Sequence, residues 1–71
     1  MPTIHINREP VELYKILKFE GLVGTGGEAK VVIDQGMVKV NGEPELQRRK
    51  KIRHGDVIEF MECAYQIVYE P

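Results

Sequence analysis

The first segment of the chain alternates between apolar and polar residues. Ile4 and Ile6 flank a polar position, and the run Thr3–Asn7 contains several β-branched residues. A period of two residues places alternate side chains on opposite faces of an extended strand. The pattern therefore predicts a short β-strand at the start of the chain.

A helical spacing of apolar residues follows this strand. Asn7–Pro10 supplies a helix start, acids at Glu9 and Glu12 suit the positive end of the helix dipole, and Gly21 supplies a stop. The sequence predicts a first helix between these limits. Its broad apolar stripe consists of Val11, Leu13, Tyr14, Ile16 and Leu17.

A second helix has a clearer beginning. Thr25 and Glu28 are three residues apart, which is the spacing of a capping box. Gly36 closes the segment. The buried stripe of this helix is predicted to be Ala29, Val32 and Ile33. Both helices are too short to be stable alone, so they need each other and a sheet.

After the second helix the apolar period becomes two. Val38 and Val40 point one way, Asn41–Gly42 turns the chain, and Leu46 and Ile52 are expected to point inward. Further on, a turn at Gly55–Asp56 leads into the last elements. These are strands at Val57–Phe60 and Tyr65–Tyr69. The order predicts an α+β domain, with two short helices packed on a small antiparallel β-sheet.

Length and composition narrow the possible functions. The 71 residues form one small domain, 1–71, without room for a deep catalytic cleft. Cys63 is the only cysteine, so an internal disulfide is excluded. There is no secretion signal and no apolar run of membrane-spanning length, which predicts a cytoplasmic protein without membrane contact. A monomer is the default expectation.

Charge is concentrated in one segment of this nearly neutral chain. The formal net charge is −1, yet Gln47–Arg53 places five cations in seven residues. Such a block on a balanced domain suggests a surface for a polyanion such as RNA. The alternative is that these side chains only keep the protein soluble. The five cations are Arg48, Arg49, Lys50, Lys51 and Arg53.

Several fixed spacings resemble the S-four-type RNA-binding domain, named after a small-subunit ribosomal protein. The matching pattern, within residues 11–60, is Ala29-x-x-x-Ile33-x-x-Gly36-x-Val38-x-Val40-Asn41-Gly42 followed by Gly55-Asp56-x-Ile58. The stand-alone YaaA/YbcJ-like subgroup is closer still, through Thr25-Gly26-Gly27-Glu28-Ala29-Lys30 and Asn41-Gly42-Glu43-Pro44-Glu45. The resemblance implies an L-shaped helix pair (the alpha-L motif) that binds ribosomal RNA or tRNA.

Two positions depart from the wider family. Its members usually begin the first helix with Arg-Leu-Asp, where this chain has Glu12-Leu13-Tyr14. They usually begin the second helix with Ser-Arg, where this chain has Thr25-Gly26. Two phosphate-binding cations implied by the resemblance are therefore missing. The resemblance implies that the subgroup compensates through its basic loop.

Other candidate RNA contacts lie near the helices. At the second helix start, Thr25, Gly26 and Gly27 offer backbone N–H groups to an anion, although the capping box also uses such donors. Lys30 and Lys39 are expected on the outside, where they extend the basic surface. The alternative for Lys30 is an ion pair with Asp34 one turn later. Weaker candidates are Lys15 and Lys18.

The remaining chemistry favours binding over catalysis. His5, His54 and Cys63 lack metal-ligand spacing, and the glycine-rich segment 24–27 lacks the ending of a P-loop, so no metal and no cofactor are expected. No nucleophile has a base partner, so no enzyme activity is expected. Four of the five aromatic side chains are assigned to the core or to strand faces. They are Tyr14, Phe19, Phe60 and Tyr65.

The sequence thus favours a non-catalytic RNA-binding module that holds structured RNA through phosphates. Its site is predicted at the basic loop and the start of the second helix. The rival function is a protein-interaction adaptor, in which the cations meet an acidic protein and the last strand offers a pairing edge. DNA is a third possible ligand, because charge alone does not distinguish it from RNA.

Overall fold

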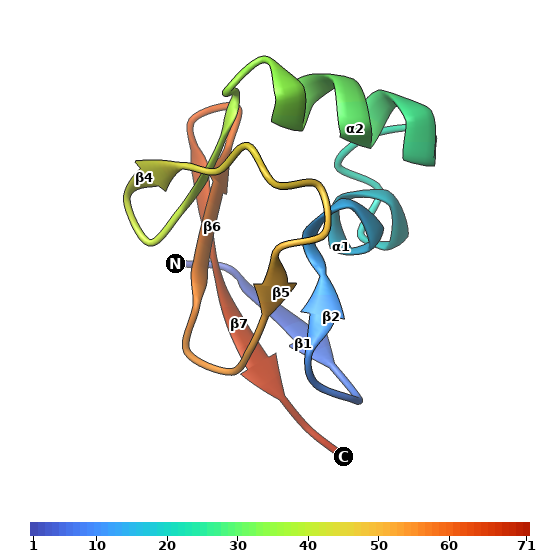
Figure 1. The fold of residues 1–71 in the computed structure, drawn as a ribbon. Helices are drawn as coiled ribbons and strands as arrows, with labels where there is room; N and C mark the ends of the chain where they lie inside the picture. Colours follow the sequence, from blue (N-terminus) through green and yellow to red (C-terminus); the bar gives the residue numbers. More distant parts are fainter.

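The computed structural model describes all residues, 1–71, and has two helices on one side of a β-sheet (Figure 1). The helices are α1 (Leu13–Phe19) and α2 (Gly26–Asp34). A five-stranded sheet has the order β1-β7-β6-β3-β4, and β2 pairs with β5 apart from it. The strands are β1 (Thr3–Ile6), β2 (Val11–Glu12), β3 (Val38–Val40), β4 (Glu43–Pro44), β5 (Lys51–Ile52), β6 (Val57–Phe60) and β7 (Cys63–Tyr69).

The predicted α+β class is confirmed, with one difference in the sheet. β1 is parallel to β7, with Ile4 opposite Ile67, so the sheet is mixed and not wholly antiparallel. Consecutive antiparallel strands can be joined by tight turns, and β6 and β7 are joined in this way. β1 is separated from β7 by both helices, so no hairpin constrains its direction.

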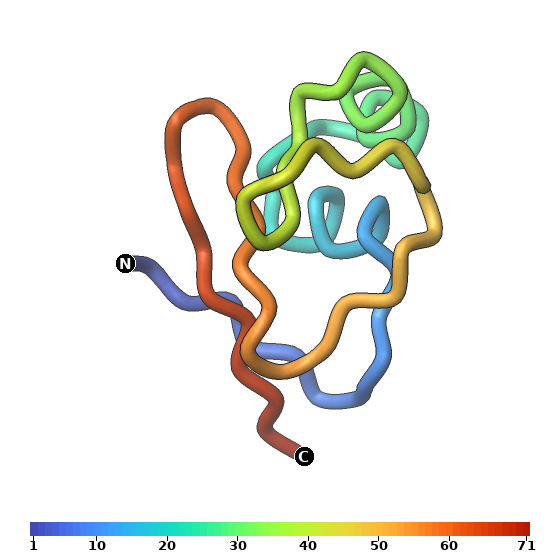
Figure 2. Tube along the Cα trace, turned by 60° about the vertical axis from the view of Figure 1, so that its left-hand side comes forward, coloured from blue at the N-terminus to red at the C-terminus, as the bar shows by residue number.

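One hydrophobic core lies between the helices and the sheet. Figure 2 shows both helices on the same side of the β6–β7 hairpin. Sixteen apolar residues are buried, and no polar or charged residue is. The largest fully buried side chains are Leu13, Leu17, Ile33, Val38, Ile52, Ile58 and Ile67. The predicted inward stripes of both helices therefore supply much of the core.

The start of the first helix was predicted too early. The helix begins at Leu13, and Val11 pairs with Ile52 in a short antiparallel ladder. The backbone N–H groups of Leu13 and Tyr14 donate to the carbonyl oxygens of Lys50 and Arg48, at 2.9 and 3.1 Å. Contacts with a distant loop therefore decide where the helix starts.

Local turn and cap predictions are confirmed. Asn41 and Gly42 have φ values of 53° and 89°, and the flanking residues Val40 and Glu43 are paired. Positive φ at both central positions is the requirement of a two-residue hairpin turn. At α2, Thr25 Oγ1 accepts the Glu28 N–H at 3.0 Å. The Glu28 carboxylate accepts from Gly24 and not from the cap residue itself.

Two predicted inward side chains are instead exposed. Phe19, the last residue of α1, is 64% exposed, and Leu46 is 62% exposed. The chain around Leu46 lies outside the sheet and turns toward α1, so only Ile52, at the far end of that segment, reaches the core. Apolar character alone did not reveal which of these positions faces inward.

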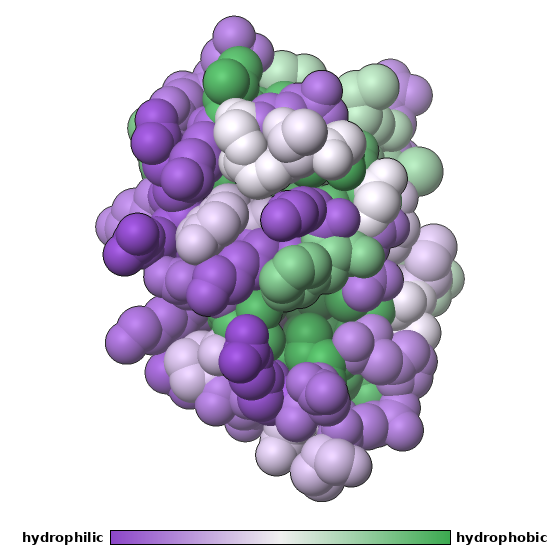
Figure 3. Space-filling model, turned by 90° about the vertical axis from the view of Figure 1, so that its right-hand side faces the viewer, coloured by the Kyte–Doolittle hydropathy of each residue, from purple (hydrophilic) through white to green (hydrophobic).

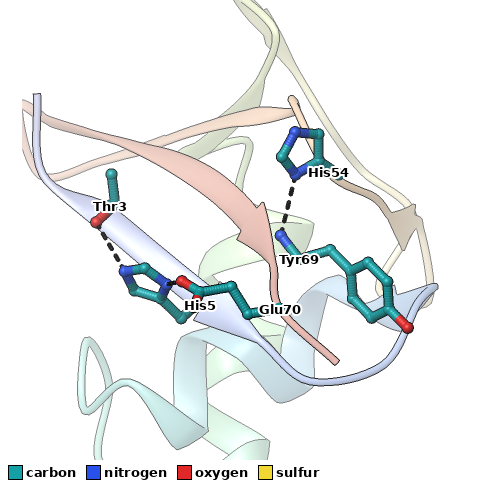
Figure 4. A network of polar contacts seen from close by, with 5 residues as sticks. All are labelled: Thr3, His5, His54, Tyr69 and Glu70. Atoms are coloured by element: carbon teal, nitrogen blue, oxygen red, sulfur yellow. Dashed lines mark hydrogen bonds and ion pairs between the residues drawn. The ribbon is translucent and has the colours of Figure 1, made fainter.

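Two histidines hold the ends of the strands together (Figure 4). His54 Nδ1 accepts the Tyr69 N–H at 3.0 Å, and the His54 N–H donates to Glu9 Oε2 at 2.8 Å. His5 Nδ1 contacts the Glu70 carboxylate, which joins β1 to the end of β7. In the five-stranded sheet, β7 lies between β1 and β6. The expectation that the last strand offers a free pairing edge is wrong, because the outer strands are β1 and β4.

Candidate nucleic-acid interface

The segment Gln47–Arg53, here called the basic loop, is attached to both helices. Its carbonyl oxygens at Arg48 and Lys50 accept the first two N–H groups of α1. The backbone of Lys51 then pairs with that of Glu12 in the β2–β5 ladder. The loop runs beside the two helices in Figure 1. The charged side chains therefore project from a backbone that is fixed by hydrogen bonds.

One loop cation also contacts α2. Arg48 Nε donates to Asp34 Oδ1 at 2.9 Å, and the Arg48 Nη2 group binds Oδ2 of the same carboxylate. This two-point contact holds the pKa of the Asp34 carboxyl below its ordinary value, chiefly through the hydrogen bonds. Partial loss of hydration opposes that shift, and charge attraction adds to it. Arg48 therefore fixes the loop to the end of α2.

The other loop cations are more available. Arg49 is 77% exposed, and its Nε lies 3.8 Å from Glu12 Oε2, which is too long for a hydrogen bond. Lys50, Lys51 and Arg53 are exposed, and none of them forms an ion pair. Three of the five predicted cations thus have no carboxylate partner. Such side chains can meet phosphate without breaking an internal contact.

The predicted site at the start of α2 lies apart from the basic loop. Thr25, Gly26 and Gly27 are at the N-terminal end of this helix, whereas Arg48 contacts its last residue. Nine residues at about 1.5 Å per residue separate the two ends by roughly 13 Å. Thr25 and Glu28 already use part of the hydrogen-bonding capacity there. These are two places on one surface helix and not one cluster.

Lys39 does not join the basic loop. It lies in β3 between Val38 and Val40, which are buried on the side of the sheet that carries the helices. Because successive strand residues point to opposite faces, the exposed Lys39 side chain projects from the other face. The basic loop, in contrast, is bonded to α1 and α2.

The Tyr14 ring of α1, for which core packing was the preferred prediction, also contacts a side chain of α2. The ring is partly buried against the core. Lys30 Nζ of α2 lies 5.2 Å from the ring centroid, and Lys15 Nζ lies 6.0 Å from it. Both distances allow cation–π attraction. The alternative ion pair of Lys30 with Asp34 does not form, because Asp34 binds Arg48.

A small cavity lies beside the basic loop. It has a volume of about 300 Å³ and is lined by Arg8, Pro10, Val11, Glu12, Lys15 and Lys51. Glu12 Oε1 lies 3.2 Å from Lys15 Nζ at this cavity. Arg8 was not predicted from the sequence, because it belongs to no motif and lies in the connection between β1 and β2.

A larger cavity, of about 710 Å³, is lined by residues of β1 and α1. Its apolar lining includes Ile4, Ile16 and Phe19, and its polar lining includes Arg8 and Glu20. Figure 3 shows a hollow with hydrophobic surface inside a hydrophilic rim on the side of the molecule that carries α1 and β2. The charged lining of this cavity consists of two carboxylates, Glu20 and Glu70, against the single cation Arg8, so the charges disfavour a phosphate here.

The structure shows no constellation of side chains for metal binding. No group of three or more His, Cys, Asp and Glu side chains is placed to hold a metal ion. Neither helix has the length and apolar character needed to cross a bilayer. Cys63 is exposed and unpaired with another cysteine.

Comparison with known proteins adds three results. The S4 domain family model matches residues 4–68. The "Putative RNA-binding protein YbcJ" of Escherichia coli (strain K12) is 39% identical over 69 residues, which are 96% of this chain and 99% of YbcJ. The "Probable ribosome maturation protein RlbA" of Bacillus subtilis (strain 168) is 38% identical over 56 residues, which are 79% of each protein.

Two solved structures share the fold. The solution structure of E. coli YbcJ, described as having an αL motif involved in RNA binding, has a TM-score of 0.71 at 39% identity. That match covers 96% of this chain and 87% of YbcJ. The crystal structure of the 30S ribosomal protein S4e from Thermoplasma acidophilum has a TM-score of 0.74 at 28% identity. It covers 90% of this chain but 34% of S4e.

Proposed function

Because the chain belongs to the S4 domain family of non-catalytic binding modules, we propose that it binds structured RNA through phosphate contacts of its basic loop. The observation that carries this proposal is the fixed backbone of the loop. Its carbonyl groups bind α1 and its Arg48 side chain binds α2. Lys50, Lys51 and Arg53 project from this support without carboxylate partners.

The proposed RNA is of the ribosomal or tRNA class. RlbA is named for ribosome maturation and S4e is a ribosomal protein, which supports ribosomal RNA first. The contacts available are mostly charges, and charges bind phosphates without reading bases. The protein therefore recognises RNA shape more than sequence. The proposal includes a monomer that acts in the cytoplasm.

A salt series tests the phosphate contacts. If about five phosphates are bound, the logarithm of affinity should fall with the logarithm of salt concentration at a slope of roughly −4. Replacing Lys50 by Glu should lower affinity for structured RNA by about eightfold or more at about 0.1 M salt, because each contact contributes about 0.9 to that slope. The slope should also become shallower by about one.

Lys39→Glu is the matched control, because it changes the net charge equally on the other face of the sheet. It should have little effect on affinity. Equal losses for Lys50→Glu and Lys39→Glu would show that only overall charge matters and would refute the loop site. Binding of A-form RNA duplex, B-form DNA duplex and single strands at one salt concentration then tests the preference for RNA.

Ribonuclease treatment separates RNA binding from the adaptor function. Partners captured by the protein from a lysate should be lost after nuclease digestion if RNA links them. Partners that persist would favour contact between the basic loop and an acidic protein. The adaptor has less structural support than the sequence suggested, since β7 is not an edge strand.

A further inference from the structure

The cavity of about 300 Å³ beside the basic loop gathers cations from three separate segments. Arg8 comes from the β1–β2 connection, Lys15 from α1 and Lys51 from β5. Lys51 is distant from Arg8 and Lys15 in the sequence, so no motif marks the three as a group. The fold alone brings them around one opening.

Glu12 is the single acidic residue in the cavity lining. Its two oxygens face two different cations, with Lys15 Nζ at 3.2 Å and Arg49 Nε at 3.8 Å. Its backbone pairs with that of Lys51. The Glu12 side chain is 28% exposed, so it is more shielded than Arg49. A carboxylate thus occupies the place among these cations where an external anion would bind.

We propose that this cavity binds one phosphodiester group of the RNA, and that Glu12 limits this binding by competing for Lys15 and Arg49. The inference rests on the proposed function and adds a second contact region, in which Arg8 is a new ligand and Lys15, a weaker candidate from the sequence, has a defined place. The volume greatly exceeds the ~30 Å³ that one water molecule occupies in the liquid, so a phosphate group can enter.

The charges also favour this ligand. Around the cavity, Arg8, Lys15, Lys51 and Arg49 supply four positive charges against the one negative charge of Glu12. Lys15 and Arg49 can turn from the carboxylate to a phosphate, because their contacts with it are partly exposed and therefore weak. Arg8 and Lys51 have no ion pair to break.

Replacing Glu12 by Gln tests the competition directly. The variant should bind structured RNA more tightly than wild type, by roughly eightfold at ~0.1 M salt, if one further cation becomes free to contact phosphate. The salt slope should become steeper by about one. Glu20→Gln is the control, since Glu20 is an exposed acid next to α1 with no ion pair, and it should leave both quantities unchanged.

Loss variants test the cavity ligands. Arg8→Gln and Lys15→Gln should each lower affinity, whereas Lys39→Gln, an exposed cation on the face of the sheet away from the helices, should not. The loss from Lys15→Gln should be larger in the Glu12→Gln background, because the competing carboxylate is then absent. Thermal unfolding of each variant verifies that the fold is retained.

The outcomes separate this inference from the proposed function. Wild-type RNA binding with no gain in Glu12→Gln, or with no loss in Arg8→Gln and Lys15→Gln, would overturn the cavity site while leaving the basic loop intact. Failure of the wild-type protein to bind structured RNA would overturn both. If inorganic phosphate shifts the Lys15 and Lys51 side-chain NMR signals and RNA does not, the RNA assignment is wrong.

Discussion

Arg48 of the basic loop and Asp34 at the end of α2 form an ion pair that joins these two parts of the chain. The guanidinium binds both carboxylate oxygens, with Nε donating to Oδ1 at 2.9 Å. Asp34 is the last residue of α2, where a carboxylate faces the negative end of the helix dipole. Arg48 offsets this unfavourable position and holds the basic loop against α2.

The contact predicts a specific dependence of stability on pH. Arg48 lowers the pKa of Asp34 in the folded protein below the value of about 3.9 expected for an unfolded chain. A lowered folded-state pKa contributes stability that is present above the unfolded pKa and is lost as pH falls through the folded pKa. The thermal midpoint of wild type should therefore exceed that of Asp34→Asn at neutral pH, and the difference should shrink below about pH 4.

Thermal unfolding by circular dichroism at a series of pH values measures this difference. Glu43→Gln is a suitable control because Glu43 is exposed on β4 and has no ion pair. Its midpoint should follow wild type throughout. A constant difference between wild type and Asp34→Asn from pH 7 to pH 2 would contradict the role of the Arg48 contact.

Local signals in the sequence were sufficient for much of the fold. The Thr25 cap, the Asn41–Gly42 turn and the strand at Val57–Phe60 depend on residues within a few positions of one another. Their physical causes, which are capping, positive φ and alternation, act at short range. The family signature also contains these same positions, so resemblance and local chemistry agreed.

Longer-range features could not be predicted from local patterns. The start of α1 depends on carbonyl groups of Arg48 and Lys50, more than thirty residues away in sequence. The parallel pairing of β1 with β7 joins the two ends of the chain. The same limitation applies to the candidate site. The cluster of Arg8 and Glu12 with loop cations is brought together by the pairing of β2 with β5, whose residues are about forty positions apart in sequence.

Removing the cap of α2 should destabilise the protein measurably. Thr25 Oγ1 accepts the Glu28 N–H at 3.0 Å, and Thr25→Ala removes this acceptor. The free energy of unfolding should fall by about 1 kcal/mol, measured by urea denaturation. Thr25→Ser keeps the oxygen and should lose much less. Equal losses for the two variants would indicate that the hydroxyl does not cap the helix.

The stability of the hairpin turn between β3 and β4 should depend on the backbone conformation of Gly42 and not on steric crowding around it. Gly42 has φ of 89°, and no atom lies within 4 Å of the position that a Cβ would occupy. Gly42→Ala should lower the free energy of unfolding by about 1 kcal/mol, because a side chain disfavours this region. Gly24→Ala is the control. Gly24 lies outside that region, and its Cβ would meet only Glu28 Oε1 at an ordinary 3.8 Å.

The His54 side chain should protect the end of β7 from opening. Nδ1 accepts the Tyr69 N–H at 3.0 Å (Figure 4), and the backbone N–H of His54 donates to Glu9 Oε2, so one residue connects the β5–β6 turn to two other segments. His54→Ala removes only the imidazole acceptor and should cost about 1 kcal/mol of unfolding free energy. Hydrogen exchange of the Tyr69 amide should accelerate, because its acceptor is lost. His54→Asn offers a carbonyl oxygen near the position of Nδ1 and should restore part of the protection. Unchanged exchange at Tyr69 in His54→Ala would show that the strand end is held by the β1 pairing alone.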